Sequence, residues 1–222
     1  MKISIITPIY NESSKIETFL QELQKLSGDF EVLFADGGSA DDTLSKIPDD
    51  YRVISCGKGR ALQMNTAAQA ALGDYLWFVH CDSRIPADAL QQIENSGGQF
   101  GCFHIGFDYA GPFMGCNTFM SNRRALMDHI AFGDQGIWIR RDLFLDQGGV
   151  PELPIMEDYE FSRQMKRKKF RLHVLPGRII TSGRRYQTNH PLKTMWSMIW
   201  LRHLYRRGMD IQEIARRYKD IR

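Results

Sequence analysis

Three apolar runs in the first half of the chain end in polar side chains. The first run ends in the segment TPIYNE (7–12). The second run, EVLFA (31–35), is followed by Asp36, and the third, YLWFV (75–79), by His80, Cys81 and Asp82. A carboxylate at such a position can accept hydrogen bonds from the imide of a nucleotide base or from a ribose hydroxyl. Asp36 is therefore a candidate nucleotide contact, and an Asx turn is the alternative for it.

Cations and free backbone N–H groups come together in CGKGRALQMN (56–65). Lys58 and Arg60 alternate with glycines directly before an Ala-rich stretch that favours a helix, and a helix N-terminus stabilises anions. We expect this segment to hold a diphosphate, with a solvated basic loop as the alternative. A Walker loop is excluded because its full spacing is absent.

Two more polar pairs lie in the second half of the chain. Glu157 and Asp158 stand at the predicted start of a helix, where carboxylates stabilise the helix dipole and could serve only as caps. Asp134 and Gln135 lie between glycines before an aromatic strand, where a plain turn is the alternative. In the first half of the chain, the segment with Thr7, Pro8 and Glu12 also has a purely structural alternative, because Asn11 or Ser13 could cap the next helix.

The elements that must position these residues alternate between strand and helix. Strands are predicted over 2–10, 31–36, 52–56 and 75–80, and helices over 13–26 and 60–72. Ser14 and Glu17 form a candidate capping box for the first helix. The alternation predicts a parallel sheet covered on both faces, in which ligands gather beyond the carboxyl ends of the strands. The polar strand ends should therefore converge on one site.

Beyond residue 95 the alternation is looser. We predict a strand and turn over 97–111, a helix over 119–130, a strand over 135–141 and a helix over 157–168. Two further helices are expected over 191–208 and 210–222, the last with Asp210 and Glu213 as a capping box. No repeat, linker or low-complexity segment divides the chain, which favours a single domain.

Composition supports an ordinary globular protein, since the 222 residues are 43% apolar and 25% charged. The four cysteines form no CxxC pair, so neither a zinc finger nor a disulfide framework is indicated. The sequence has no signal-peptide pattern and no apolar run of roughly 18 residues. These features predict a cytoplasmic location.

The net charge of +3 hides an asymmetry between the two parts of the chain. Residues 161–222 contain 17 Lys and Arg against 3 Asp and Glu, a net charge of +14, and residues 1–160 carry −11. This division predicts an acidic body that binds a metal and a basic tail that faces phosphates or an anionic surface.

Taken together, five segments resemble the family 2 glycosyltransferases with the GT-A fold. The resemblance covers residues 3–186, and its segments are TPIYNE, ADGGSADDT, GKGRALQMNTAAQAALGDYLWFVHCDS, GDQGIWIRRDLF and PIMEDYEFSRQMKRKKF. The GRALQMN and GDQ forms are similar to those of a small bacterial subgroup. The resemblance implies a mixed, mostly parallel sheet with helices on both faces, and a hexosyltransferase-like enzyme (EC 2.4).

The resemblance also implies a division of the single domain, 1–222. Residues 1–95 would bind the nucleotide sugar, 96–186 would hold the acceptor and the catalytic residues, and 187–222 would form basic amphipathic helices. The donor would be a UDP or GDP sugar. The implied donor contacts are Thr7, Pro8, Tyr10, Glu12, Asp36, Lys58, Arg60, Cys81, Asp82, Arg184 and Arg185.

In this family the fourth strand usually ends in Asp-x-Asp, which holds Mg²⁺ or Mn²⁺ against the donor phosphates. Here His80 replaces the first acid and Asp82 retains the second. Asp82 is expected to contact the metal, since hard cations prefer oxygen ligands. His80 is either a nitrogen ligand compatible with Mn²⁺ or a side chain that supports Asp82 by a hydrogen bond.

By the same resemblance, Asp158 is the general base that removes the proton of the acceptor hydroxyl, and Glu157 orients the acceptor or a neighbouring loop. One displacement at the anomeric carbon inverts its configuration. Asp134 and Gln135 are expected on the acceptor side. The Gln-x-x-Arg-Trp pattern of processive polymerases is absent near Arg184, which favours addition of single sugars.

The tail segment PLKTMWSMIWLRHLYRRG (191–208) presents apolar residues at helical spacing. The predicted face contains Leu192, Met195, Trp196, Ile199, Trp200 and Leu204. Packing on the core or on a second subunit would explain it, and so would contact with the inner face of a membrane, because Trp and basic residues together suit that interface. The acceptor would then be a lipid-linked molecule, and nucleic acid is not an expected partner.

Two other functions fit parts of the sequence. A sugar nucleotidyltransferase shares the α/β layers, although no Gly-rich loop follows the first strand to take a nucleoside triphosphate. A degenerate binding module would account for His80, and retention of Asp36, Asp82 and Asp158 speaks against it.

Overall fold

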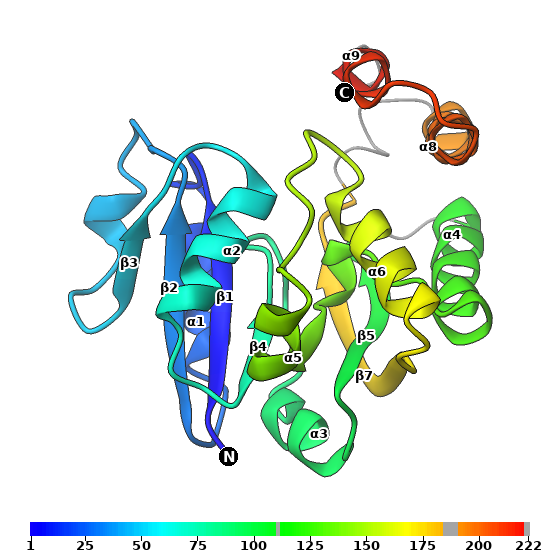
Figure 1. Cartoon of the computed structure of the whole chain (residues 1–222). Helices are drawn as coiled ribbons and strands as arrows, with labels where there is room; N and C mark the ends of the chain where they lie inside the picture. Colours follow the sequence, from blue (N-terminus) through cyan, green and yellow to red (C-terminus); the bar gives the residue numbers. More distant parts are fainter. Residues whose placement is uncertain (110–111, 184–190, 220–222) are drawn as a thin grey trace.

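The computed structural model describes residues 1–109, 112–183 and 191–219, and its centre is a seven-stranded sheet (Figure 1). The strands have the spatial order β3-β2-β1-β4-β6-β5-β7. In chain order they are β1 (Ile3–Ile9), β2 (Phe30–Asp36), β3 (Arg52–Ser55), β4 (Tyr75–Phe78), β5 (Phe100–Phe107), β6 (Trp138–Arg140) and β7 (His173–Thr181).

The sheet is mixed and mostly parallel, as predicted. Strands β1 to β4 pair in parallel, so their carboxyl ends lie along one edge, and Ile9 stands opposite Asp36. Strand β6 runs antiparallel to both β4 and β5, while β5 and β7 are parallel.

Side chains alternate between the two faces of the sheet, and helices pack on both faces. Ile5 and Phe34 pack with α1 (Ile16–Leu23) and α3 (Ala89–Asn95) in one apolar cluster. Side chains of opposite direction, such as Ile6 and Leu33, form the second cluster with helices on the other face. Those helices are α2 (Arg60–Ala70), α5 (Arg141–Asp146) and α6 (Glu157–Arg167), and Figure 1 shows them in front of the strands.

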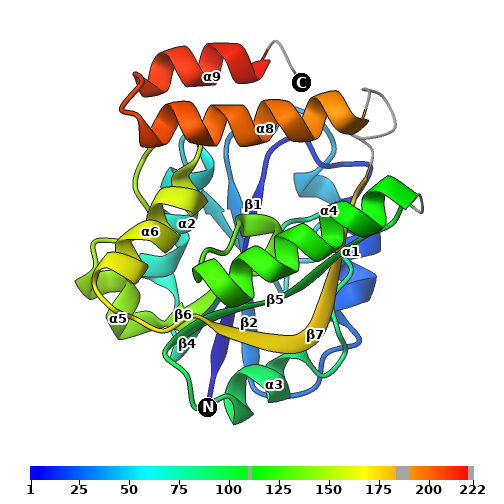
Figure 2. The same ribbon diagram turned by 90° about the vertical axis from the view of Figure 1, so that its right-hand side faces the viewer.

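Figure 2 shows α4 (Pro112–Arg123) alongside β5, and α8 (Pro191–Arg206) and α9 (Ile211–Lys219) across the top of the molecule. Helix α4 continues into a wider turn over Arg124–Asp128. Helices α8 and α9 contact each other and pack over α6. None of the helices within the described ranges is long and apolar enough to cross a membrane.

Several local predictions were wrong. The first helix begins at Ile16 after Lys15 and has no side-chain cap, so the proposed box of Ser14 and Glu17 does not form. Helix α4 begins at Pro112, seven residues before the predicted start. Short helices α3 and α5 were not predicted. At the last helix, the Asp210 carboxylate does accept a hydrogen bond from the Glu213 N–H, at 3.0 Å.

Strand β7 was also missed, because Pro176 and Gly177 interrupt its pattern. The register with β5 shifts between Phe103 and His104, which pair with Leu175 and Arg178. The two intervening residues of β7 form a bulge. Bulges are positions where a strand tolerates proline and glycine.

Candidate active site

The carboxyl ends of β1 and β2 are tied together by Gln63, a buried side chain of α2. Its Nε2 donates hydrogen bonds to the carbonyl oxygens of Ile9, at 2.8 Å, and Ala35, at 2.7 Å. A Cβ at Gly37 would lie 3.1 Å from the same nitrogen, which explains the glycine there. Sequence analysis gave Gln63 no role, because only the sheet brings these carbonyl groups together.

The loops that follow β1 and β2 form one hydrogen-bonded unit. Asn11 adopts a left-handed backbone conformation (φ 53°), and its Oδ1 accepts a hydrogen bond from the Ala40 N–H at 2.9 Å. The Glu12 N–H donates to Thr43 Oγ1 at 2.7 Å, and the Ser13 N–H donates to Asp41. Asn11 and Ser13 therefore join two loops and do not cap a helix.

The buried Asp36 carboxylate accepts hydrogen bonds from the backbone N–H groups of Gly38, at 3.0 Å, and Ser39, at 3.1 Å. These are the contacts of an Asx turn, the alternative considered from the sequence. The turn fixes the carboxylate at the end of β2. Contact of Asp36 with a nucleotide stays a prediction.

Tyr10 and Lys58 bring the loops after β1 and β3 into contact. The Lys58 ammonium lies 3.8 Å from the centre of the Tyr10 ring, and both residues are exposed. This arrangement is a cation–π pair at the mouth of the site. Thr7, which was also predicted to border the donor, is fully buried, whereas Pro8 lines the neighbouring pocket.

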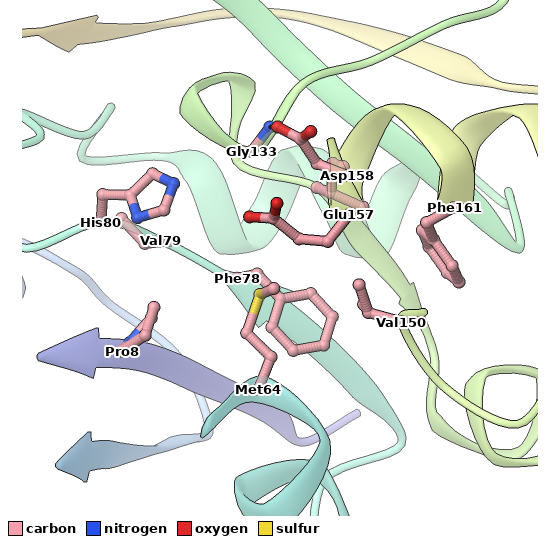
Figure 3. Close-up of a pocket in the computed structure, with 11 residues that line it drawn as sticks. Pro8, Met64, Phe78, Val79, His80, Gly133, Val150, Glu157, Asp158 and Phe161 are labelled. Carbon is pink, nitrogen blue, oxygen red and sulfur yellow. Dashed lines mark hydrogen bonds between the residues drawn. The ribbon is translucent and has the colours of Figure 1, made fainter. Parts of the chain in front are cut away.

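A pocket lies where this edge of the sheet meets α2 and α6 (Figure 3). Its apolar wall includes Met64, Phe78 and Phe161. His80, Glu157 and Asp158 supply its titratable groups, and Figure 3 shows the His80 ring facing the Glu157 carboxylate. The structure thus brings the predicted catalytic pair together with the residue that replaces the first acid.

Asp158 is held by a backbone group of the GDQ segment. The Gly133 N–H donates to its Oδ2 at 2.7 Å, and the Tyr159 N–H donates to its Oδ1 at 2.6 Å. The segment is anchored on α6 by Ser162, whose Oγ donates to the Ala131 carbonyl at 2.8 Å. The two backbone hydrogen bonds fix the orientation of the Asp158 carboxylate, which is still partly exposed.

The space around Gly133 is tight. A Cβ added there would lie 2.9 Å from His80 Nε2 and 3.4 Å from Asp158 Oδ2. The side chains of His80 and Asp158 therefore both lie against Gly133. Only a residue without a side chain leaves both groups in place, which the sequence pattern did not reveal.

Glu157 is 3% exposed and pairs with Arg60, the last residue of the CGKGR segment. Arg60 Nε lies 2.7 Å from Glu157 Oε1, and the Arg60 side chain is half exposed. Oε2 of Glu157 is buried without a hydrogen-bond partner among the described residues. Burial raises the pKa of the Glu157 carboxyl, although the Arg60 charge opposes the shift.

This ion pair predicts a pH-dependent loss of stability in Arg60→Met. Without the guanidinium the pKa of Glu157 in the folded protein should rise further above its value in the unfolded chain. As the pH rises, the unfolded chain then releases this proton first, which favours unfolding. Stability therefore falls as the pH rises. We expect Arg60→Met to lower the free energy of unfolding by about 2 kcal/mol at about pH 8 and by less at about pH 5.

Urea denaturation of both proteins at the two pH values measures this difference. Glu157→Gln is the matched variant, because it removes the buried charge and keeps the shape. Combined with Arg60→Met, it should abolish the pH dependence of the loss. An equal loss from Arg60→Met at both pH values would show that the guanidinium acts only through packing.

His80 is expected to be neutral near pH 7. Burial and the nearby Arg60 charge lower the pKa of its imidazole, against the opposing effect of Asp82 and Asp158. A neutral imidazole can act as a hydrogen-bond partner or as a metal ligand.

The residues fit a divalent cation only in part. In the described ranges, no group of three or more His, Cys, Asp or Glu side chains is placed to hold a metal ion. Asp82 is exposed next to His80 at the end of β4. Such a donor set suits an ion held by one carboxylate together with substrate phosphates, which is the usual arrangement for Mg²⁺.

Two predicted site residues point away from the site. Cys81 is buried in the apolar cluster under α1 and α3, so its side chain does not face a ligand. Gln135 is fully buried, and its Oε1 accepts hydrogen bonds from Arg124 Nη2, at 2.9 Å, and from the Phe132 N–H, at 3.2 Å. Gln135 therefore supports the loop from inside and does not reach an acceptor.

The remaining predictions have different outcomes. Asp134 lies in the same loop, close enough to Arg124 for its charge to raise the pKa of that guanidinium, which burial lowers to about 10. Contact of Asp134 with an acceptor stays a prediction. Arg184 and Arg185 lie outside the described residues.

The first part of the sequence matches a known family. A sequence model of the family described as Glycosyl transferase family 2 matches residues 4–96. YfnE of Bacillus subtilis (strain 168), described as an uncharacterized glycosyltransferase, is 36% identical over 99 residues, which are 40% of this chain and 25% of YfnE. The chain thus spans about a quarter of that relative.

Solved structures match most of the chain. TarS from S. aureus (residues 1–349) has a TM-score of 0.65 at 22% identity over 83% of this chain and 61% of the TarS chain. Mannosyltransferase PcManGT from Pyrobaculum calidifontis, in complex with GDP-Man and Mn²⁺, has a TM-score of 0.67 at 18% identity over 99% of this chain and 69% of that chain. These GT-A structures confirm the predicted fold.

Proposed function

We propose that this protein transfers a sugar from a nucleotide diphosphate sugar to an acceptor hydroxyl. The observation that carries the proposal is the pocket that Asp158, oriented by the Gly133 N–H at 2.7 Å, shares with His80 at the end of β4. The match of residues 4–96 to Glycosyl transferase family 2 supports it. TarS has been solved with UDP-GlcNAc and PcManGT with GDP-Man, which supports a UDP or GDP sugar as donor.

The donor would lie along the carboxyl edge of the sheet. Asp36, at the end of β2, and Tyr10, whose ring contacts Lys58, would receive the base and ribose. Lys58 and Arg60 provide positive charge at the start of α2, where the helix N-terminus also favours a diphosphate. Arg60 would then be shared between the donor and Glu157.

Asp158 acts as the general base. As the acceptor oxygen forms its bond to the anomeric carbon, its proton moves to the carboxylate, and the bond from that carbon to the diphosphate oxygen breaks. The electron pair of the broken bond leaves with the nucleoside diphosphate. The backbone bonds from Gly133 and Tyr159 hold the carboxylate in one orientation, which is how positioning raises a rate. A single displacement inverts the anomeric configuration.

A divalent cation, Mn²⁺ or Mg²⁺, would be held by Asp82 and the donor phosphates, with His80 beside it. When bound, it supplies charge that stabilises the leaving diphosphate. Lys58 and Arg60 contribute in the same direction, so no protein acid has to protonate the leaving group.

A panel of UDP and GDP sugars, each tested for hydrolysis with Mn²⁺ and with Mg²⁺, tests this function. We expect slow release of nucleoside diphosphate from one class of donor, because water can replace the acceptor. A parallel reaction contains nucleoside triphosphates and sugar phosphates. Release of pyrophosphate there, without hydrolysis of any donor, would contradict the proposal and indicate a nucleotidyltransferase.

Asp82→Asn should weaken binding of the nucleoside diphosphate by about tenfold in the presence of Mn²⁺, because the lost charge acts through the ion. In EDTA the two proteins should bind equally. Calorimetric titration under both conditions measures the difference. Asp88→Asn is the matched control, since Asp88 is an exposed acid six residues away on the loop before α3. Equal weakening with and without metal would remove Asp82 from the metal site.

A further inference from the structure

Large apolar side chains are exposed on two neighbouring helices. Trp196 and Trp200 on α8 are 65% and 55% exposed, and Met127, directly after α4, is 68% exposed. Helices α4 and α8 contact each other, and Figures 1 and 2 both place them on the same side of the molecule. We call this surface the α4–α8 face; its apolar residues are Phe119, Met120, Leu126, Met127, Trp196 and Trp200.

The exposed side chains are not the ones that attach these helices to the protein. Helix α8 packs through Leu201 and Leu204, and the α4 segment through Met114 and Ala125. The sequence had predicted that Leu204 shares a face with the tryptophans. In the structure Leu204 is buried, whereas both tryptophans stay exposed, although the Trp200 ring stacks on His203 of the same helix at 5.6 Å.

The charge of this surface is predominantly positive. Residues 112–127 and 191–207 contain no Asp or Glu. Arg123, Arg206 and Arg207 are exposed on or next to the same helices. The surface therefore combines tryptophan, methionine and arginine, and the acid that directly follows the first of these segments is the exposed Asp128, which ends the turn after α4.

We infer that the α4–α8 face docks on the surface of an anionic lipid bilayer. Tryptophan suits the boundary between headgroups and acyl chains, and arginine is attracted to anionic headgroups. A second copy of this chain is a poorer partner. A symmetric dimer through this face would place Arg123, Arg206 and Arg207 of one copy against the same positive surface of the other.

The inner side of α8 packs on the residues that flank the catalytic loop. The Tyr205 ring lies 6.1 Å from that of Tyr159, and the Arg202 guanidinium lies 5.3 Å from the Phe132 ring. Phe132 precedes Gly133, and Tyr159 follows Asp158. Docking would therefore place the pocket beside the bilayer. If the proposed function holds, an acceptor carried on a lipid could reach it.

Sedimentation with phosphatidylcholine vesicles, with and without phosphatidylglycerol, tests the inference on the full chain. We expect binding only to the anionic vesicles and release as salt rises, since salt screens the attraction. Trp196→Ser/Trp200→Ser should weaken this binding by about tenfold or more. Leu72→Ser is the matched control, because Leu72 is 70% exposed outside this face, and this variant should bind like the parent.

Arg206→Gln/Arg207→Gln is a second variant that leaves the apolar residues in place, and it should also weaken binding. Failure of the parent to bind anionic vesicles, or equal binding by the tryptophan variant, would overturn the inference. So would a dimer, detected by light scattering, that the tryptophan variant converts to a monomer. Nucleoside diphosphate binding is measured on the same samples. Its absence in the parent would contradict the proposed function and leave the vesicle result valid.

Discussion

Asp158→Asn should lower the rate of sugar transfer by about 10²- to 10⁴-fold, the usual cost of losing a general base. The amide oxygen of asparagine can still accept the hydrogen bond from the Gly133 N–H, so the loop should keep its position. Affinity for the nucleoside diphosphate with Mn²⁺ should change little, because Asp36, Lys58 and Asp82 are intact. Single-turnover rates and calorimetric titration on the same preparation separate the two effects.

Asp142→Asn is the control for this substitution. Asp142 lies in the first turn of α5, as Asp158 does in α6, and it is exposed. Its variant should transfer sugar at the parental rate. If Asp158→Asn transferred equally fast, Asp158 would be only a helix cap. If it lost nucleotide affinity as well, Asp158 would belong to the donor site.

Gly133→Ala should also have a large effect, a loss of about 10²-fold in transfer rate, because a small displacement of a catalytic group is costly. The new methyl group would lie 2.9 Å from His80 Nε2 and 3.4 Å from Asp158 Oδ2, so one of these side chains must move. The Gly133 backbone does not have a positive φ, so alanine adds no backbone strain. The rate should fall while nucleotide affinity stays within a few-fold.

Gly115→Ala provides the comparison. Gly115 lies in α4, and a Cβ there would meet nothing within 4 Å, so this variant should retain full activity. Thermal melting of both variants checks that the fold is intact. Parental activity in a folded Gly133→Ala protein would show that the closeness of His80 and Asp158 has no role in catalysis.

The donor half of the fold could be predicted because its pattern is local. Short apolar runs end in polar residues, and parallel pairing then places those ends along one edge whatever the details of the loops. The predicted strand over 31–36 became β2, with Asp36 as its last residue. A second local pattern, the helix predicted over 157–168, correctly put Glu157 and Asp158 at the start of α6.

The contacts that make a site from these residues could not be predicted in this way. Arg60 pairs with Glu157, and Gly133 binds Asp158, across long separations in sequence. Neither partner carries a local signal of the contact. The pairing exists because β6 inserts between β4 and β5 and so brings the second half of the chain against α2.

Gln135 and Cys81 show the opposite error. Both stand next to residues that line the pocket, and sequence position alone suggested that they do so too. Alternation along an extended segment turns a neighbour inward, which puts Cys81 in the core. Gln135 is buried because the Arg124 and Phe132 groups need a hydrogen-bond acceptor inside the loop.

The central claim is that the protein catalyses a single displacement at the anomeric carbon of a nucleotide diphosphate sugar. NMR spectroscopy of the reaction with the donor found in the panel, followed over time, tests it most directly. We predict that nucleoside diphosphate appears while the anomeric carbon of the first-formed sugar product has the configuration opposite to that of the donor. A first-formed product that keeps the donor configuration, or the appearance of pyrophosphate in place of nucleoside diphosphate, would contradict the account.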